Sequence, residues 1–392
     1  MGTIKQRTRR GKGILRGVHI EEGERLYVGI DTHKKDYHCA VWSKDRDALV
    51  VSWVGPAQAE ALMRRLEPCG GQVARIVYEA GPTGFTLARR LAQAGWPAQV
   101  VSAAHTPEAP VQEDKCDRLD AKKLAQYASK NLLRAVYVLT EQEEWDREVF
   151  RSRDRICRQV RRIKQQTKAF LLFHGLAEPA GLKNWSLEAV AALGSLELAG
   201  PLRFGLDELL SDLAYHKTRL LEATGRLKAL SLTDRYRESC ERLCGPPGVG
   251  LIIVMGFLLE LPRPERFASG RQVGRILALS PRIRSSGQTR REVGRHRGGQ
   301  GRLRSLLIEG AWGWRRRDPM AFAQYNRLLA NTGSPYKAIT ALARKLAIIL
   351  WKMETSKTPY CPGLLNIPAG VFEGMKRKAA KASGRRGARA SA

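Results

Sequence analysis

Four carboxylates in the first third of the chain have the context of a metal site. Asp31 ends the apolar stretch LYVGID, and Glu79 ends a second apolar stretch, IVYE. Asp117 and Asp120 stand three residues apart in KCDRLDA, a spacing that on a helix places both on one face. An ionised carboxylate at the end of a buried strand is costly unless a cation compensates its charge.

Mg²⁺ is the cation that oxygen ligands of this kind favour. Two such ions about 3.5 to 4 Å apart can hold the attacking and leaving oxygens of a phosphodiester. Taken singly, Asp31 also fits a turn residue, Glu79 a neighbour of a helix N-cap, and Asp117 with Asp120 a solvated helix face. All four together, in this order, favour a metal site that acts on phosphodiesters.

Residues 280–304 could supply a second reactive group. The segment reads SPRIRSSGQTRREVGRHRGGQGRLR, with eight arginines and a single acid, Glu292. Ser285 and Ser286 form its hydroxyl-rich bend, and a serine beside guanidinium groups can attack a phosphodiester because the cations stabilise the developing charge. A serine in a basic loop more commonly only hydrogen-bonds phosphate, and the residues alone favour that reading.

The arginines of this segment predict contact with a nucleic-acid backbone. Guanidinium groups bind phosphate through paired hydrogen bonds, and closeness to Ser286 motivates the choice of residues. We expect six arginines to bind nucleic acid: Arg282, Arg284, Arg290, Arg291, Arg295 and Arg297.

The composition also predicts a polyanionic partner. The 392 residues include 68 Lys and Arg against 38 Asp and Glu, a formal net charge of +30, which exceeds what solubility requires. We find no signal peptide and no apolar stretch of membrane-spanning length, so no membrane partner is expected. Seven scattered cysteines predict reduced thiols and a cytoplasmic protein; Cys240 and Cys244 lack a second ligand pair and are interpreted as structural.

Hydrophobic periodicity places the four acids in a mixed α/β layer. Three consecutive strands followed by alternating helices and strands have the order of an RNase H-like fold. Strands are predicted at 26–31, 37–43, 48–54, 75–79 and 98–102, and helices at 56–67, 83–94 and 118–130.

The middle of the chain has helical patterns and almost no strand signal. Leucines recur every seven residues from 206 to 227 (Leu206, Leu213, Leu220 and Leu227), which suggests a coiled coil within or between subunits. An amphipathic helix packed on its own domain is the alternative. Further on, GPPGVGLIIVMGFL lacks the Lys-Ser/Thr of a phosphate loop, so nucleotide hydrolysis is not expected. This turn either meets a DNA phosphate or simply starts a helix.

These observations divide the chain into five expected parts. The first and last are rich in Lys and Arg, and the last is expected to be disordered until bound. The parts are a basic arm (1–25), an α/β domain (26–140), a helical or coiled-coil linker domain (141–238), a C-terminal domain with the serine (239–355) and a basic tail (356–392).

Together the motifs resemble the insertion-sequence transposases with a DEDD-type RuvC-like domain, a family related to the Piv and MooV invertases and to the bridge-RNA-guided recombinases. The resemblance covers about residues 26–350. The motifs with the four acids are matched by YVGIDTHKKD, VYEAGPTG and KCDRLDAKKLA, although Cys116 stands where Thr or Asn is more usual. The C-terminal transposase domain is matched in order by PPGVGLIIV, RFASGRQV, LALSPRIRSSG and GRLRSLLIEGAW.

The resemblance implies an RNase H-like (RuvC-like) N-terminal domain and a mostly α C-terminal transposase domain. It implies that the four acids bind Mg²⁺, and that Ser286, rather than Ser285 or Ser280, forms a covalent phosphoserine link to DNA. It also implies a homo-oligomer, a dimer or a tetramer built from dimers, that acts on donor and target DNA under the guidance of a structured noncoding RNA. Because recombination of this kind pairs subunits, we favour the leucine repeat as a dimer contact.

Two other functions remain compatible with the residues. A metal-dependent RuvC-type nuclease would cut DNA structures without a covalent intermediate, and its C-terminal domain would only bind DNA. An RNA-binding protein with a decayed catalytic domain is disfavoured because all four acids are present. The extra basic arm and basic tail remove no catalytic residue of the family pattern.

Overall fold

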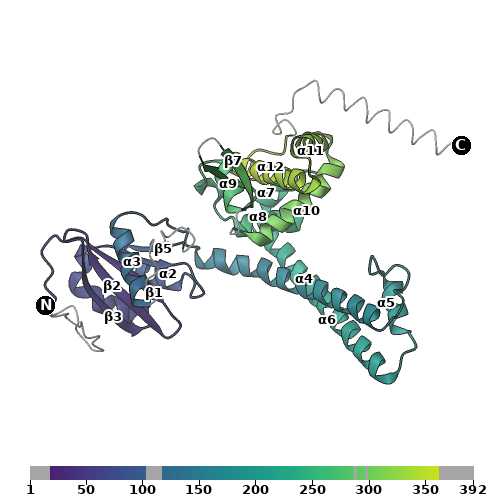
Figure 1. Ribbon diagram of the computed structural model, residues 1–392, viewed down its shortest axis with the longest axis horizontal. Coiled ribbons are helices and arrows are strands. Elements are labelled where there is room, and N and C mark those ends of the chain that lie inside the picture. The colour runs from purple at the N-terminus through teal and green to yellow at the C-terminus, as the bar shows by residue number, and fades with distance from the viewer. Residues whose placement is uncertain (1–17, 103–116, 287–288, 296–298, 362–392) are drawn as a thin grey trace. The chain divides into compact units, whose positions relative to one another are not determined.

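The computed structural model describes residues 18–102, 117–286, 289–295 and 299–361, with the backbone alone for 117–119, 282–286 and 289–295 (Figure 1). The chain forms two compact units, residues 1–142 and 143–392. Across the described ranges, no helix combines the length and apolar character needed to cross a membrane.

The first unit is built on a five-stranded mixed sheet. Strand β1 pairs antiparallel with β2 and parallel with β4, and the strand order is β3-β2-β1-β4-β5. The strands are β1 (Leu26–Thr32), β2 (Asp36–Ser43), β3 (Ala48–Pro56), β4 (Val73–Glu79) and β5 (Ala98–Val101). All five predicted strands are confirmed, each within two residues at either end.

Helices cover both faces of this sheet. Residues such as Val28, Ile30 and Tyr78 pack against α1 and α2, whereas Tyr27 and Val77 pack against α3. This division follows the alternation of side chains along a strand. The connecting elements are α1 (Ala59–Leu66), the short 3₁₀ helix η2 (Glu67–Gln72), α2 (Thr86–Gln93) and α3 (Asp117–Ser129).

The second unit opens with paired helices that bury the leucine repeat within one chain. The elements are α4 (Glu141–Phe173), α5 (Leu187–Gly194), α6 (Gly200–Ser231) and α7 (Arg237–Leu243). Leu213 and Leu220 of α6 pack with Val160 and Ile163 of α4, and Leu227 joins the C-terminal core. Within the chain the repeat therefore packs against a neighbouring helix, one of the two arrangements that the heptad suggested, and the dimer contact stays a prediction.

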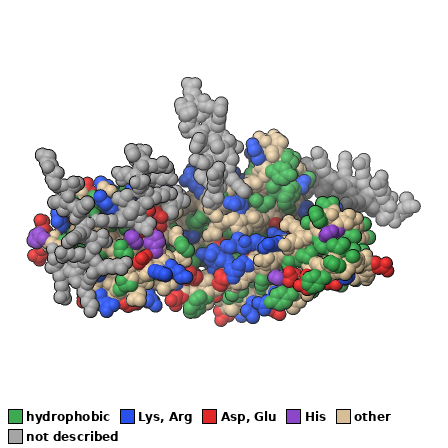
Figure 2. Space-filling model, turned by 60° about the horizontal axis from the view of Figure 1, so that its bottom comes forward, with side chains coloured by type: hydrophobic (Ala, Val, Ile, Leu, Met, Phe, Trp, Pro, Cys, Tyr) green, Lys and Arg blue, Asp and Glu red, His purple; other side chains and the backbone are tan. Residues whose placement is uncertain are grey.

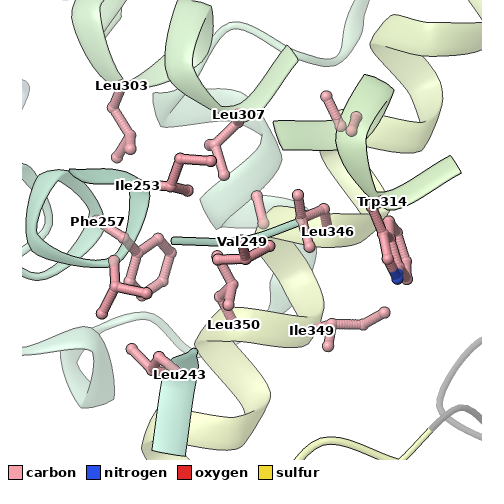
Figure 3. Close-up of a cluster of buried hydrophobic side chains, with 14 of the residues drawn as sticks. Leu243, Val249, Ile253, Phe257, Leu303, Leu307, Trp314, Leu346, Ile349 and Leu350 are labelled. Carbon is pink, nitrogen blue, oxygen red and sulfur yellow. The ribbon is translucent and has the colours of Figure 1, made fainter. Parts of the chain in front are cut away.

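The rest of the second unit packs helices around one core. The elements are α8 (Leu251–Glu260), the 3₁₀ turn η4 (Pro264–Arg266), α9 (Gly270–Ile276), β6 (Pro281–Ser286), β7 (Thr289–Arg295), α10 (Gly301–Arg317), α11 (Pro319–Thr332) and α12 (Pro335–Ser356). Figure 3 shows side chains of α8, α10 and α12, among them Ile253, Leu307 and Leu346, converging in this core. The α/β part followed by a mostly helical part agrees with the predicted fold class at that level.

An ion pair between buried or half-buried side chains ties α4 to this core. Glu260 of α8 has no exposed side-chain surface, and Arg151 donates two hydrogen bonds to its carboxylate, both 2.9 Å long. Removing one partner of a buried pair leaves an uncompensated charge, so loss of Arg151 alone would destabilise the contact of α4 with α8.

Candidate active site

Asp31 and Glu79 stand at the same edge and on the same face of the sheet. Strands β1 and β4 are parallel neighbours whose register pairs Ile30 with Tyr78, so the next residue of each strand is one of the two acids. Counting back two residues from Asp31 and Glu79 gives Gly29 and Val77, and Val77 packs on the α3 side. The alternation along a strand therefore directs both carboxylates to the face that α3 covers.

Helix α3 approaches β1 closely enough to bring a third acid to this edge. A Cβ on Gly29 would overlap the carbonyl oxygen of Ala121 and the amide nitrogen of Ala125, so glycine is required for this approach. Tyr27, earlier on β1, belongs to the buried cluster with residues farther along α3. The helix thus runs antiparallel to β1, and its first turn, which includes the exposed Asp120, lies toward the Asp31 end.

The immediate neighbours of Asp31 are polar. Its side chain is 26% exposed, and Oδ2 lies 3.3 Å from Nε2 of His33. The rings of His33 and His38 meet edge to face with centroids 5.4 Å apart. The hydroxyl oxygens of Thr32 and Thr83 are 3.0 Å apart, so a hydrogen bond joins the end of β1 to the turn after β4.

These neighbours were not among the predicted site residues. Their signal was present in the sequence, because His33 follows the first acid in DTHKK and Thr83 follows the second in EAGPTG. A search for polar residues just beyond each strand end would have found both.

The acids have the right chemistry for a divalent cation but do not form a finished ligand cluster in the described part of the chain. Carboxylate oxygens are the ligands that Mg²⁺ prefers. Among the side chains that the structure describes, no three His, Cys, Asp or Glu residues lie close enough together to hold a metal ion. Asp117 is the first residue of α3, and its side chain lies outside the described residues.

Ser286 lies at the end of a two-stranded hairpin. Strand β6 ends at Ser286, which pairs with Thr289 across the turn, and Ser285 pairs with Arg290. Arg284 pairs with Arg291 in the same ladder. The backbone therefore brings three predicted phosphate-binding residues into register beside the predicted nucleophile.

The side chains of the predicted nucleic-acid contacts lie outside the described residues. This applies to Arg282, Arg284, Arg290, Arg291 and Arg295, whose backbone belongs to β6 and β7, and to Ser286 itself. Arg297 lies outside the described residues altogether, as do residues 1–17 and 362–392 of the predicted arm and tail.

Basic surface is also present on α4. Figure 2 shows Lys and Arg side chains gathered near the middle of the face in view, where α4 runs. Arg155 is paired with Glu148, 2.5 Å away, whereas the exposed Arg161 and Arg162 have no ion pair with any residue described. This surface is compatible with the polyanionic partner that the net charge predicts.

The burial of Cys240 agrees with a structural thiol, whereas Cys244, which was interpreted in the same way from the sequence, is exposed. The cysteines in the described ranges are free, and Cys39, Cys69 and Cys240 are buried. Burial is the main cause that raises the pKa of Cys240 to about 12, and its Sγ lies 3.3 Å from the sulfur of Met255.

Comparison with known proteins defines the class to which this fold and these acids belong. The sequence profile for a transposase of the DEDD, IS110 type matches residues 28–175, and the profile described as transposase IS116/IS110/IS902 family matches residues 240–326. Together these matches cover more than half of the chain and include Asp31, Glu79, Asp120 and Ser286. The chain belongs to the IS110/IS116 family of insertion-sequence transposases.

Two curated relatives extend the similarity over nearly the whole chain. The transposase for insertion sequence element IS1111A of Coxiella burnetii is 26% identical over 363 residues, 91% of this chain and 94% of its own length. The transposase for insertion sequence element IS1328 of Yersinia enterocolitica is 25% identical over 338 residues, 85% of this chain and 98% of its own length. Membership of a transposase family implies DNA cleavage and rejoining at a general level, and domains of the DEDD type typically use divalent metal ions.

Proposed function

We propose that this transposase cuts and rejoins DNA through a covalent phosphoserine intermediate, with Ser286 as nucleophile and a Mg²⁺ site formed by Asp31, Glu79, Asp117 and Asp120. The observation that carries the proposal is the position of Asp31 and Glu79, at adjacent ends of parallel strands and on the face that α3 covers. The sheet order supports an RNase H-like domain, as does the helix that brings Asp120 to the same edge.

In the proposed reaction the oxygen of Ser286 attacks a DNA phosphorus. A bond from Oγ to phosphorus forms, the bond from phosphorus to one deoxyribose oxygen breaks, and that oxygen leaves with a proton as a free hydroxyl. Attack by the corresponding hydroxyl of the second DNA reverses the step and releases the serine. The energy of the phosphodiester is kept in the covalent link, so rejoining needs no nucleotide cofactor.

The acids would hold the metal and set its position. Mg²⁺ bound there would withdraw charge from the scissile phosphate in the transition state. The carboxylates of Asp31 and Glu79 would fix the position of that ion, because both side chains start from a sheet rather than from a loop. The Thr32–Thr83 hydrogen bond keeps the two strand ends in a fixed relation.

We further propose that a homo-oligomer assembles the acids of one subunit with the serine of another, and that a structured noncoding RNA selects donor and target DNA. The two compact units of the chain support this division, since the acids belong to residues 1–142 and Ser286 to residues 143–392.

A covalent trapping assay tests the chemistry. The protein is incubated with Mg²⁺, RNA transcribed from the DNA that flanks its gene, and end-labelled donor and target DNA, then quenched in denaturant. We expect a labelled protein–DNA adduct with the wild type and none with Ser286→Ala. Ser285→Ala is the matched control, and it should retain the adduct.

The assay also separates the alternative. Cleavage that leaves free DNA ends, forms no adduct and survives in Ser286→Ala would show a metal-dependent nuclease of the RuvC type and refute the serine mechanism. Omitting the RNA tests the proposed guide RNA separately. Recombination at the same DNA sites without the RNA would refute the guide RNA and leave the serine mechanism standing.

A further inference from the structure

Helix α12 carries two adjacent cations, Arg344 and Lys345, that the proposed active site does not use. Helix α11, which packs on α12, adds Arg327. Arg327 is exposed, and the other two side chains are partly exposed. None of the three forms an ion pair with any residue in the described ranges.

The packing of α9 against α12 determines where Arg344 lies. Two glycines of α9, Gly270 and Gly274, lie one helical turn apart and meet Ile348 and Arg344, which lie one turn apart on α12. A Cβ on Gly270 would lie 2.7 Å from Ile348 Cγ2, and one on Gly274 would lie 3.2 Å from Arg344 Cδ. The missing side chains thus let the stem of Arg344 lie directly on α9.

The same glycine places Arg344 beside the start of the hairpin that carries Ser286. A Cβ on Gly274 would also lie 3.0 Å from Oγ of Ser280, the residue immediately before β6. Arg304 of α10 adds a further cation near this point, since it donates a hydrogen bond of 3.4 Å to the carbonyl of Leu277. The foot of the hairpin is therefore flanked by guanidinium groups from two helices.

The charge of this cluster has little compensation from the neighbouring helices. Helices α9 and α11 carry no acid, α12 carries one, Glu354, and α10, which also packs on α11 and α12, carries the exposed Glu309. The carboxylate of Glu354 accepts hydrogen bonds from Ser239 and Arg242 and pairs with Lys357, so its binding capacity is used elsewhere.

The lack of a counter-charge affects the protonation of Lys345. Burial, followed by the charges of Arg344 and Arg327, lowers the pKa of its ammonium group from the ordinary value. An anion bound there would relieve this repulsion, because it would stand near three cations in a partly dehydrated position.

We propose that Arg344, Lys345 and Arg327 bind the phosphate groups of a nucleic-acid backbone at the foot of the β6–β7 hairpin. The proposal rests on the proposed function, because it assumes that nucleic acid lies along this hairpin. Its ligand is the phosphodiester chain shared by the DNA substrates and the RNA. By holding the backbone on a packed helix pair, the cluster positions the strand that enters the hairpin.

Salt dependence of binding provides the test. Each phosphate neutralised contributes about 0.9 to the slope of log binding constant against log salt concentration for duplex DNA. The full chain is titrated with labelled duplex DNA and, separately, with duplex RNA of the same sequence, at several NaCl concentrations. For Arg344→Gln with Lys345→Gln we expect the slope to fall by roughly 1.8, and adding Arg327→Gln should lower it by about 0.9 more.

Matched variants distinguish the loss of this binding site from a general loss of positive charge and from misfolding. Arg237→Gln with Lys357→Gln removes the same charge from cations already paired with Asp234 and Glu354, and should leave the slope unchanged. Arg344→Lys with Lys345→Arg keeps both charges and should retain the wild-type slope. Thermal melting of every variant reports the fold.

If the Gln variants show a reduced salt slope with DNA alone, with RNA alone or with both, the site is supported, and the result identifies which nucleic acid it binds. An unchanged slope with both polymers, in a variant that melts like the wild type, overturns the proposal while leaving the trapping assay to judge Ser286. Absence of nucleic-acid binding by the wild type would instead overturn the proposed function itself.

Discussion

At the scale of single residues, Asp31 is the acid on which the proposed chemistry depends most. It is partly buried at the end of a central strand and lies beside His33. We expect Asp31→Asn to reduce DNA cleavage by at least about 100-fold, because an amide is a poor ligand for Mg²⁺. Nucleic-acid binding should persist, since the basic surface is unchanged; cleavage and binding are measured on the same preparation.

The control for this variant is Asp45→Asn. Asp45 is an exposed acid in the turn between β2 and β3, where it pairs with Arg25 2.5 Å away. Loss of this carboxylate should leave cleavage unchanged. Full cleavage by Asp31→Asn would remove Asp31 from the proposed site.

Cys240 gives a prediction about pH. Its ordinary thiol pKa of 9.0 is raised to about 12 in the folded protein, chiefly by burial. A group whose pKa is raised by folding stabilises the protein fully below the unfolded value, and that contribution is lost as the pH rises through the folded value. Denaturant titrations should therefore show the free energy of unfolding falling between about pH 9 and about pH 12.

The comparison variant is Cys240→Ala, which lacks this titrating group. Its unfolding free energy should fall less steeply over the same pH interval, because the two proteins share their other buried groups, among them Tyr236, whose pKa burial also raises. Equal slopes for the two proteins would contradict the assignment.

Residue-level reasoning predicted where the acids lie in the sheet better than it predicted the contacts around them. The positions of Asp31 and Glu79 at adjacent strand ends were predictable because each acid follows an apolar stretch, while their role as Mg²⁺ ligands stays a prediction. Thr83 could be found in the sequence as a polar residue beyond the second strand end, but its hydrogen bond with Thr32 spans 51 residues of sequence and is not encoded by any local pattern.

At the scale of secondary-structure elements, the contact of α3 with β1 controls the candidate site. Gly29→Ala would force its methyl group into the backbone of α3. We expect a loss of about 1 to 3 kcal/mol in unfolding free energy, as for other overpacked sites, and reduced cleavage because the turn with Asp120 is displaced. Urea denaturation and the cleavage assay measure the two effects.

Gly71→Ala is the matched substitution, because a Cβ there meets no atom within 4 Å. It should leave both stability and cleavage near the wild-type values. If Gly29→Ala behaved in the same way, the close approach of α3 would be refuted.

The elements themselves differ in how well the sequence predicted them. Strands β1 to β5 alternate or concentrate apolar residues because each is buried on at least one face, so periodicity revealed all five. The β6–β7 hairpin was missed because β7, TRREVGR, is dominated by charge. Its strand character comes from backbone pairing with β6, which hydrophobic pattern does not report.

The leucine repeat shows a different limit of sequence reasoning. A heptad identifies a buried helical seam but does not name the helix that covers it. In this chain the leucines of α6 pack against Val160 and Ile163 of α4.

At the scale of the whole molecule, the packing of α6 against α4 predicts how substitutions on α6 change the free energy of unfolding. Leu213 is 1% exposed, so Leu213→Ala should lower the unfolding free energy by about 2 to 5 kcal/mol. Leu221, on the same helix, is 74% exposed, and Leu221→Ala should change it by less than about 0.5 kcal/mol. Both values come from urea titrations followed by helical circular dichroism.

Repeating these titrations over a range of protein concentrations shows whether the leucine repeat packs within one chain or between subunits. A seam within one chain predicts that the effect of Leu213→Ala is independent of concentration. An effect that fades as the protein is concentrated would support the subunit contact that the heptad suggested.

The division of the chain into two consecutive units also has a consequence for biosynthesis. Domains generally fold in turn from the N-terminus as a ribosome adds about 5 to 20 residues per second. All residues of the acid-bearing sheet lie before residue 143, so this unit can fold while the hairpin with Ser286 is still unmade. Under the proposed mechanism, a nascent or prematurely terminated chain would possess its carboxylates without a nucleophile, and the host genome would be protected from incomplete copies of the enzyme.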